Sequence, residues 1–359
     1  MNPRIQSPSF FIGKGDDKLI SFGSGQPDLP PPQEVYAILP TYKDFKYGLI
    51  QGQTNLREAI AAGYPGSTAD HFIITNGATE ALDLVFRLMA RKGKKILMPR
   101  PYYYSYPKLA HYSGLETAFY DLNKGKIDWA NFEKNLDGCV AVLINSPSNP
   151  TGSIQDVEIL HNIERVTQKR GIYVISDEVY KDLIYERENY LFKGDHIITI
   201  NSFSKTFAMC GFRVGYLYST DVEIVKACLD TKTHTSMNTN ILGQEMAYQA
   251  TRAPLKYATD QVKIWKERRD LIYSGLVNLG LDLWKPEGAF YVLPKIPGID
   301  DSNKIVNDLF YRHQMITYDG AWFGAPGRVR FSYALDTDKI REGIRRLAIY
   351  MKEEGCPLP

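Results

Sequence analysis

One lysine, Lys205, stands in a sequence context that favours covalent chemistry over a simple surface charge. Ser202 and Ser204 precede it, Arg213 follows it, and apolar runs flank the whole segment. Burial disfavours the charged form of a lysine, and a neutral amine is a nucleophile that forms a Schiff base with a carbonyl compound. The alternative is an ordinary solvated lysine, so the remaining motifs must decide between the two.

Several residues could bind the phosphate of such a carbonyl compound. Gly77, Ala78 and Thr79 open a predicted helix, and free backbone N–H groups at a helix start bind anions that glycine allows to approach closely. The two serines and Arg213 would complete a phosphate cup, because a guanidinium forms a planar fork of donors. An aldehyde that carries a phosphate is pyridoxal 5′-phosphate, so this set indicates that cofactor. The plain alternative for Gly77 is a strand-to-helix turn.

Two polar clusters follow predicted buried strands. Asp177 ends one apolar run, and a carboxylate there would favour the protonated form of a pyridine nitrogen, which is the better electron sink. Tyr180 could donate a hydrogen bond to a phenolate oxygen, and the amide of Asn149 could reach a ligand oxygen from a turn rich in proline. The alternatives are a helix N-cap for Asp177 and a plain turn around Asn149.

Aromatic and basic side chains complete the candidate site. Tyr103 lies in a cluster of tyrosines after a strand, and one such ring could stack on a planar cofactor, although packing is the commoner role. Arg328 and Arg330 share one face of a predicted strand, and an inward arginine would bind a carboxylate in a bidentate manner. For Arg328 we expect a solvated charge on an edge strand.

The elements that position these residues alternate along the middle of the chain. Residues 139–144 and 196–201 are continuous apolar runs, as in strands buried on both faces. Strands that alternate with helices predict an α/β fold with a mostly parallel sheet and helices on both faces. Because ligands of such sheets bind outside the carboxyl ends of the strands, the polar clusters lie where a site is expected.

The pattern changes in the last third of the chain. It predicts a smaller α+β unit with helices at residues 252–279 and 337–351 and strands at residues 289–293 and 328–333. Pro254 could interrupt the first of these helices. We predict a large cofactor-binding domain of residues 34–255 and a small domain formed by residues 1–33 together with residues 256–359.

Composition excludes several classes of function. The 359 residues are 44% hydrophobic with a net charge of +2, so we expect no nucleic-acid partner. No apolar run is long enough to span a bilayer and no signal peptide is expected, which predicts no membrane partner. Four scattered cysteines lack the spacing of metal ligands, so we expect reduced thiols in a cytoplasmic protein with no metal.

Taken together, the motifs resemble those of the class I/II aminotransferases, which have the pyridoxal-phosphate fold type I of the aspartate aminotransferase superfamily. The resemblance implies that the mostly parallel sheet of the large domain is seven-stranded. The resemblance runs from Gly25-Gln26-Pro27-Asp28 to Arg330, with the motifs in the family's order and at similar spacings. The order and spacing are more specific than any single motif.

The resemblance implies a role for each cofactor-binding residue. Lys205 matches the Schiff-base lysine, Asp177 the partner of the pyridine nitrogen, and Tyr103 the ring that stacks on the cofactor. Tyr180 and Asn149 match the groups that bond the cofactor's 3-oxygen. The residues that match the phosphate cup are Gly77, Ala78, Thr79, Ser202, Ser204 and Arg213.

The resemblance also implies how the substrate and a second subunit take part. Arg330 matches the arginine that binds the substrate α-carboxylate, with Asn149 and the Gly25 backbone nearby. Tyr47 matches a tyrosine that reaches the phosphate in the neighbouring subunit, which predicts a homodimer. Two stretches, residues 57–70 and 181–195, are shorter than is usual in the family, and they affect the pocket rim.

The expected reaction is amino transfer between an L-amino acid and a 2-oxo acid by a ping-pong mechanism. Lys205 would remove the Cα proton as the general base, and Asp177 and Tyr180 would tune the cofactor. The default substrates are aspartate, or a broad or aromatic range of donors, with 2-oxoglutarate. The alternative is a carbon–sulfur β-lyase or another lyase, because one fold supports several reactions.

Overall fold

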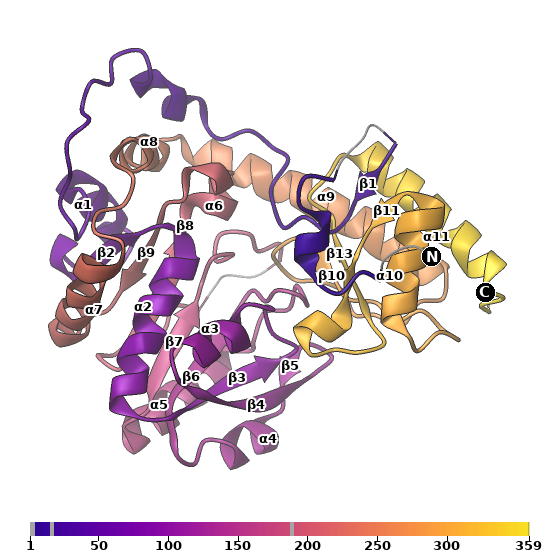
Figure 1. Ribbon diagram of the computed structural model, residues 1–359, viewed down its shortest axis with the longest axis horizontal. Helices are drawn as coiled ribbons and strands as arrows, with labels where there is room; N and C mark the ends of the chain where they lie inside the picture. The colour runs from indigo at the N-terminus through magenta and orange to yellow at the C-terminus, as the bar shows by residue number, and fades with distance from the viewer. Residues whose placement is uncertain (1–3, 15–17, 187–189, 358) are drawn as a thin grey trace.

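The computed structural model describes residues 4–14, 18–186, 190–357 and 359. Within these residues, the centre of the molecule is an eight-stranded sheet with helices on both sides (Figure 1). In order across the sheet, its strands are β2 (Phe72–Thr75), β9 (Gly215–Tyr218), β8 (Ile197–Ser202), β7 (Tyr173–Asp177), β6 (Cys139–Asn145), β3 (Lys95–Arg100), β4 (Glu116–Asn123) and β5 (Lys126–Ile127).

The strand directions confirm a mostly parallel sheet. Strands β8, β7, β6, β3 and β4 pair in parallel, whereas β9 runs antiparallel to both of its neighbours. The sheet has one strand more than expected within the described residues, because the two-residue β5 folds back as an antiparallel hairpin on β4. The register of β6 on β7 sets Asn145 beside Asp177 at the carboxyl ends of the strands.

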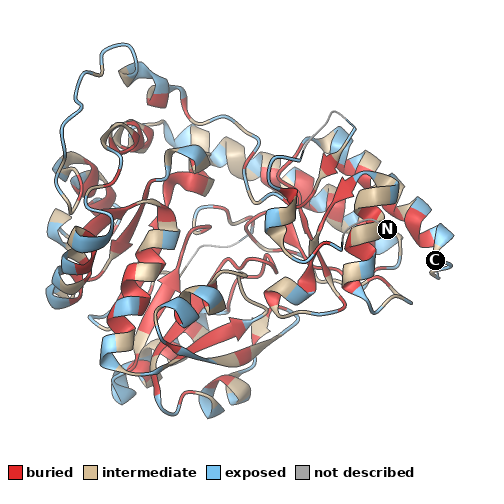
Figure 2. Ribbon diagram, in the orientation of Figure 1, coloured by how far each residue is buried: buried red, intermediate tan, exposed pale blue. Residues whose placement is uncertain are grey.

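Helices cover both faces because successive strand residues point in opposite directions. In β6, Ala141 and Leu143 pack with one hydrophobic cluster, whereas Val142 and Ile144 pack with another on the opposite face. The buried colouring of the strands shows the result (Figure 2). The helices of this part are α1 (Thr54–Ala61), α2 (Gly77–Lys92), α3 (Tyr106–Tyr112), α4 (Trp129–Lys134), α5 (Val157–Arg170), α6 (Phe203–Thr206), α7 (Val222–Thr235) and α8 (Ile241–Thr251).

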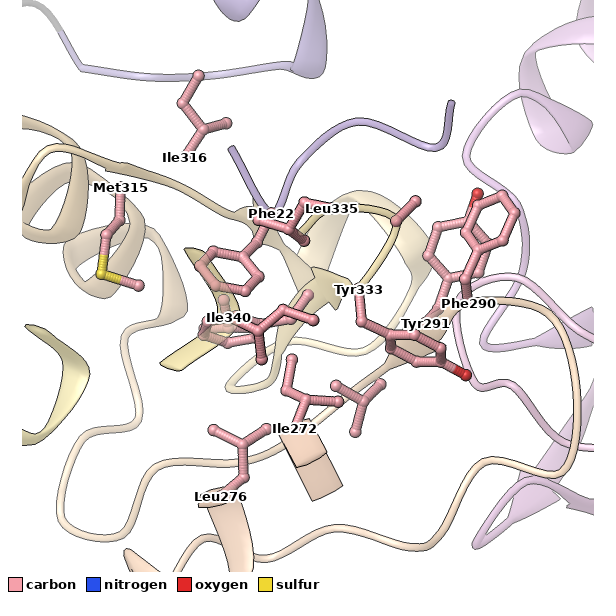
Figure 3. Packing of buried hydrophobic residues seen from close by; sticks show 14 of the residues in the cluster. Phe22, Ile272, Leu276, Phe290, Tyr291, Met315, Ile316, Tyr333, Leu335 and Ile340 are labelled. Atoms are coloured by element: carbon pink, nitrogen blue, oxygen red, sulfur yellow. The ribbon is translucent and has the colours of Figure 1, made fainter. Parts of the chain in front are cut away.

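A separate hydrophobic cluster joins the N-terminal arm to the last third of the chain. Phe22 and Ile20 of the arm lie in this cluster with Ile340 and Leu347. Figure 3 shows Phe22 packed near Ile340. Its elements are β1 (Ile20–Ser21), α9 (Leu255–Asn278), β10 (Tyr291–Val292), α10 (Ser302–His313), β11 (Met315–Ile316), β12 (Tyr318–Asp319), β13 (Val329–Ser332) and α11 (Thr337–Glu353). The exact domain boundaries at residues 34 and 255 stay a prediction.

Two sequence-based expectations for this part differ from the structure. The long helix does not begin at Arg252, because Arg252 caps the end of α8. Helix α9 begins directly after Pro254, since a proline is favoured only at a helix start. The strand that carries Arg328 and Arg330 is not an edge strand, since β13 lies between β10 and β12. Among the described residues, no helix has both the length and the apolar character that crossing a bilayer requires.

Candidate active site

The predicted site residues meet in one cavity of about 300 Å³ beyond the carboxyl ends of the central strands. It is formed by loops that follow β6, β7 and β8, by the start of α2, and by the N-terminal arm and β13. The predicted residues that line it are Gly25, Ala78, Thr79, Tyr103, Asn149, Asp177, Tyr180, Ser202, Ser204, Lys205, Arg213 and Arg330.

Lys205 is presented by the short helix α6 at the end of β8. The side chain of Ser202 caps this helix by accepting a hydrogen bond of 3.1 Å from the backbone of Ser204. The Lys205 ammonium donates to the carbonyl oxygen of Gly25. Burial lowers the pKa of Lys205, and the charges of two nearby arginines act in the same direction. The solvated-lysine alternative is therefore wrong.

Asp177 is buried at the end of β7, and both of its carboxylate oxygens have partners. Tyr106 Oη donates to Oδ2 over 2.6 Å, and the Val179 backbone N–H donates to Oδ1 over 3.2 Å. A turn rather than a helix follows, so the N-cap alternative is wrong. Burial raises the pKa of Asp177 to about 6, while the hydrogen bonds and the charge of Lys205 oppose that rise.

Tyr180 follows Asp177 in the same turn and pairs with a second phenol. Its hydroxyl lies 2.8 Å from the hydroxyl of Tyr291, and both rings are buried. Burial raises the pKa of Tyr180 well above its ordinary value, so it stays a protonated donor at neutral pH.

Anion-binding donors converge at the start of α2. The backbone N–H groups of Ala78 and Thr79 are first-turn donors of a sixteen-residue helix. Gly77 has φ +74°, and a Cβ there would lie 2.5 Å from Arg213 Nη2. Only glycine therefore lets the arginine lie against the helix start. The Ser202 hydroxyl donates to Ser204 Oγ over 2.8 Å, which leaves the proton of Ser204 as a further donor.

Arg330 is buried on the central strand of the smaller sheet. Its guanidinium donates to the Gly23 carbonyl and, over 3.0 Å, to Asn149 Oδ1. Its Nε is buried without a partner among the described residues. Three aromatic rings lie 4.5–4.7 Å from Arg330 Cζ, namely those of Tyr291, Tyr318 and Phe323. A buried cation this poorly neutralised suits an anionic ligand.

Tyr103, the ring predicted to stack on a planar cofactor, also lines the cavity. Tyr103 packs edge-on against Tyr106, with ring centroids 5.4 Å apart, and burial raises its pKa above the ordinary value. A ring on the cavity wall beside the Asp177 partner can cover a planar ligand.

Three residues that were singled out do not line the cavity, namely Gly77, which directly precedes the lining residue Ala78, Tyr47 and Arg328. Tyr47 is 84% exposed and does not line the cavity of this chain. Arg328 is not a solvated charge, because its guanidinium bonds Asp282 Oδ2 over 2.6 Å and lies over the ring of Trp284. Within the described part of the chain, residues 57–70 form most of α1 and the loop after it; residues 187–189 of the other short stretch lie outside the described residues.

Sequence reasoning missed several residues that contact the predicted ones, and two of them are tyrosines whose hydroxyl groups bond a predicted residue. Tyr106 bonds Asp177, and it belongs to the tyrosine cluster in which only Tyr103 was singled out. Tyr291 lies in the predicted strand at residues 289–293, which carried no motif. Which residue each tyrosine bonds depends on sheet register, and the spacing of residues along the sequence does not predict that register.

The residues present fit pyridoxal phosphate. The lack of a Cβ at Gly77 leaves room for the Arg213 guanidinium at the start of α2, where it can meet a phosphate together with the helix N–H groups. A carboxylate, a phenol and an amide lie on the same cavity as the lysine, which suits the nitrogen and oxygen of a pyridine ring. No cluster of metal-ligating side chains occurs among the described residues.

Comparison with known proteins identifies the family that the sequence motifs resemble. Residues 17–347 match the family described as aminotransferase class I and II. An aspartate aminotransferase from Thermotoga maritima is 32% identical over 95% of this chain and 93% of its own length. A probable aspartate/prephenate aminotransferase from Aquifex aeolicus is 30% identical over 95% of this chain and 92% of its own length.

Solved structures agree over nearly the whole chain. The T. maritima aspartate aminotransferase superposes with a TM-score of 0.89, at 30% identity over 96% of this chain and 95% of that one. An aromatic aminotransferase from Pyrococcus horikoshii also superposes with a TM-score of 0.89, at 28% identity over 97% of this chain and 100% of that one. These relatives favour amino transfer over the lyase alternative. The chain belongs to the class I and II aminotransferases, and it is a pyridoxal-phosphate-dependent transaminase.

Proposed function

We propose that this cavity moves an amino group between an L-amino acid and a 2-oxo acid, with Lys205, Asp177 and Arg330 as its central residues. One observation carries the proposal: these three side chains, with unlike charges and chemistry, line a single cavity. The cofactor, when bound, supplies the carbonyl group and the electron sink. The chain supplies the proton transfers and the orientation.

Lys205 is the proton carrier in this proposal. Its lowered pKa makes the neutral amine accessible, and a neutral amine can accept a proton from a substrate Cα. Asp177 holds a positive charge at the ring nitrogen, and Tyr180 and Asn149 bond the ring oxygen. The helix start at Gly77, Ala78 and Thr79, with Ser202, Ser204 and Arg213, holds the phosphate, and Tyr103 covers the ring.

Arg330 and its neighbours orient the substrate. The guanidinium binds the α-carboxylate, and Asn149 and the Gly25 backbone border the same space. The donor is aspartate or an aromatic amino acid, with 2-oxoglutarate as acceptor, since relatives are named for aspartate, prephenate and aromatic substrates. Tyr104 and Tyr318 add aromatic surface to the cavity, which favours acceptance of aromatic donors.

We further propose a homodimer in which Tyr47 reaches the phosphate site of the partner subunit. Tyr47 and its neighbours Phe45 and Leu49 expose 84%, 88% and 59% of their surfaces, an apolar stretch that a second copy would cover. Tyr47→Phe should weaken cofactor binding without changing the sedimentation of the dimer. A monomer in sedimentation would contradict the shared site. A cytoplasmic location stays a prediction, supported by four free cysteines.

An amino-donor panel tests the function. Purified protein with the cofactor is supplied with aspartate, phenylalanine, tyrosine and alanine, each against 2-oxoglutarate and pyruvate. We expect glutamate to form from 2-oxoglutarate, with kcat/KM for the aromatic donors within about tenfold of that for aspartate, a difference of about 1.4 kcal/mol. Pyruvate and ammonia formed from a cysteine conjugate without an oxo-acid acceptor would contradict amino transfer as the main reaction.

A further inference from the structure

Tyr291, a residue without a sequence motif, contacts three parts of the proposed site. Its hydroxyl lies 2.8 Å from that of Tyr180, and its ring lies 4.5 Å from Arg330 Cζ. A Cβ on Gly25 would lie 2.3 Å from the Tyr291 hydroxyl, so the N-terminal arm approaches this phenol as closely as glycine allows. Tyr291 itself is 1% exposed.

The pairing of strands in the smaller sheet explains how the Tyr291 side chain contacts both Arg330 and Tyr180. β10 pairs antiparallel with β13, with Tyr291 opposite Ser332. Arg330 is two residues from Ser332 and therefore on the same face, diagonal to Tyr291. The Tyr291 ring lies over the guanidinium, and its hydroxyl contacts that of Tyr180. Figure 3 shows Tyr291 beside Phe290 at one side of the packed core.

The direction of the hydrogen bond between Tyr291 and Tyr180 follows from the proposed role of Tyr180 as a donor to the ring oxygen of the cofactor. A tyrosine has one proton, so Tyr180 can donate to a ring oxygen in the cavity only if its own oxygen accepts from Tyr291. Burial raises the pKa of both phenols, to about 12 for Tyr291 and well above the ordinary value for Tyr180, and the positive charge of Arg330 opposes the rise at both. Both phenols therefore keep their protons at neutral pH.

We propose that Tyr291 is a positioning residue, which donates to Tyr180 so that the Tyr180 proton points to the cofactor's phenolic oxygen while its ring supports Arg330. This inference rests on the proposed roles of Tyr180 and Arg330. A donor to the phenolic oxygen stabilises negative charge there and lowers the proton affinity of the lysine-linked nitrogen beside it. Loss of the Tyr291 hydroxyl weakens that effect.

The test is a pH titration of the visible absorbance of the holoenzyme. In Tyr291→Phe the apparent pKa of the absorbance change should rise by about 0.5 to 1 pH unit, the effect of one hydrogen bond. Tyr333→Phe is the matched control, because Tyr333 is an equally buried phenol of the same hydrophobic cluster whose hydroxyl lies 3.2 Å from that of Tyr185, and its titration should match wild type. In a Tyr180→Phe background, adding Tyr291→Phe should cause no further shift.

Gly25→Ala gives an independent route if Tyr291→Phe does not fold. Its methyl group would displace the Tyr291 hydroxyl and should shift the titration in the same direction. A Tyr291→Phe enzyme that titrates like wild type, or a further shift in the Tyr180→Phe background, would overturn the inference. A wild-type protein without the cofactor's visible absorbance would instead overturn the proposed function, so the two failures are distinguishable.

Discussion

Tyr106 donates a 2.6 Å hydrogen bond to the carboxylate of Asp177 inside a buried part of the site. The bond opposes the effect of burial on the Asp177 pKa, and it fixes one of the two carboxylate oxygens. The other oxygen accepts from the Val179 backbone. Asp177 is therefore held in one orientation before any ligand binds.

Replacing Tyr106 should impair the site through Asp177. In Tyr106→Phe the pKa of Asp177 rises above about 6, so the carboxylate is partly protonated at neutral pH. We expect cofactor affinity to fall about tenfold, since a hydrogen bond to a charged group contributes about 1.5–3 kcal/mol. The acid limb of the activity profile should move to higher pH. Tyr120→Phe is the control, because Tyr120 is an equally buried phenol that donates to the Leu143 carbonyl.

The stability of the cofactor-free protein should depend on pH through Asp177. Its folded pKa of about 6 exceeds the ordinary 3.8, so its contribution is fully present below pH 3.8 and is lost as the pH rises through 6. Between pH 5 and pH 7.5 the loss is about 1–2 kcal/mol. Urea unfolding of wild type and Asp177→Asn at both pH values measures it, and an equal loss in the two proteins would contradict the assignment.

Arg330→Lys should raise KM for the amino donor by about 10- to 100-fold, with cofactor affinity unchanged. A lysine has one nitrogen and cannot reproduce the planar fork with which the guanidinium bonds Asn149 and the Gly23 carbonyl and binds a carboxylate in a bidentate manner. Hydrogen bonds to charged groups contribute about 1.5–3 kcal/mol. Arg328→Lys is the control, because Arg328 directly precedes β13, two residues from Arg330, and is paired with Asp282. If both variants gave the same KM, the α-carboxylate would bind elsewhere.

Gly77→Ala should weaken cofactor binding by about tenfold or more. Its φ of +74° costs an alanine about 1–2 kcal/mol, and its methyl group would displace Arg213 from the phosphate cup. Gly171→Ala carries a similar backbone cost at φ +64° with open space around it. Both variants should lose stability, but only Gly77→Ala should also lose affinity for pyridoxal phosphate. A fluorescence titration with pyridoxal phosphate measures that affinity and so separates the backbone strain from the displacement of Arg213.

Sequence predicted the strands and the groups at their ends because those signals are local. The apolar run before Asp177 predicts a buried strand, and a polar residue at its end then falls at the edge where ligands bind. The start of α2 was predicted for a similar reason, since Gly77 precedes apolar residues at helical spacing.

The contacts between distant segments could not be predicted from the sequence. The pairing of Tyr106 with Asp177, and of Tyr291 with Tyr180, depends on sheet register and on packing between the two parts of the chain. Arg328 was expected at an edge because its own strand alternates, but β10 and β12 flank β13 on both sides. Strand order is a long-range property that a single strand's pattern does not contain.

The central claim is that Lys205 binds the cofactor's aldehyde and carries the proton. The most direct measurement is the visible absorbance of the purified protein after pyridoxal phosphate is added, compared with Lys205→Ala. We predict a visible band in wild type that an amino donor changes, and no such band and no amino transfer in Lys205→Ala. A wild-type protein that shows no band, or a Lys205→Ala variant that keeps one, would contradict the account.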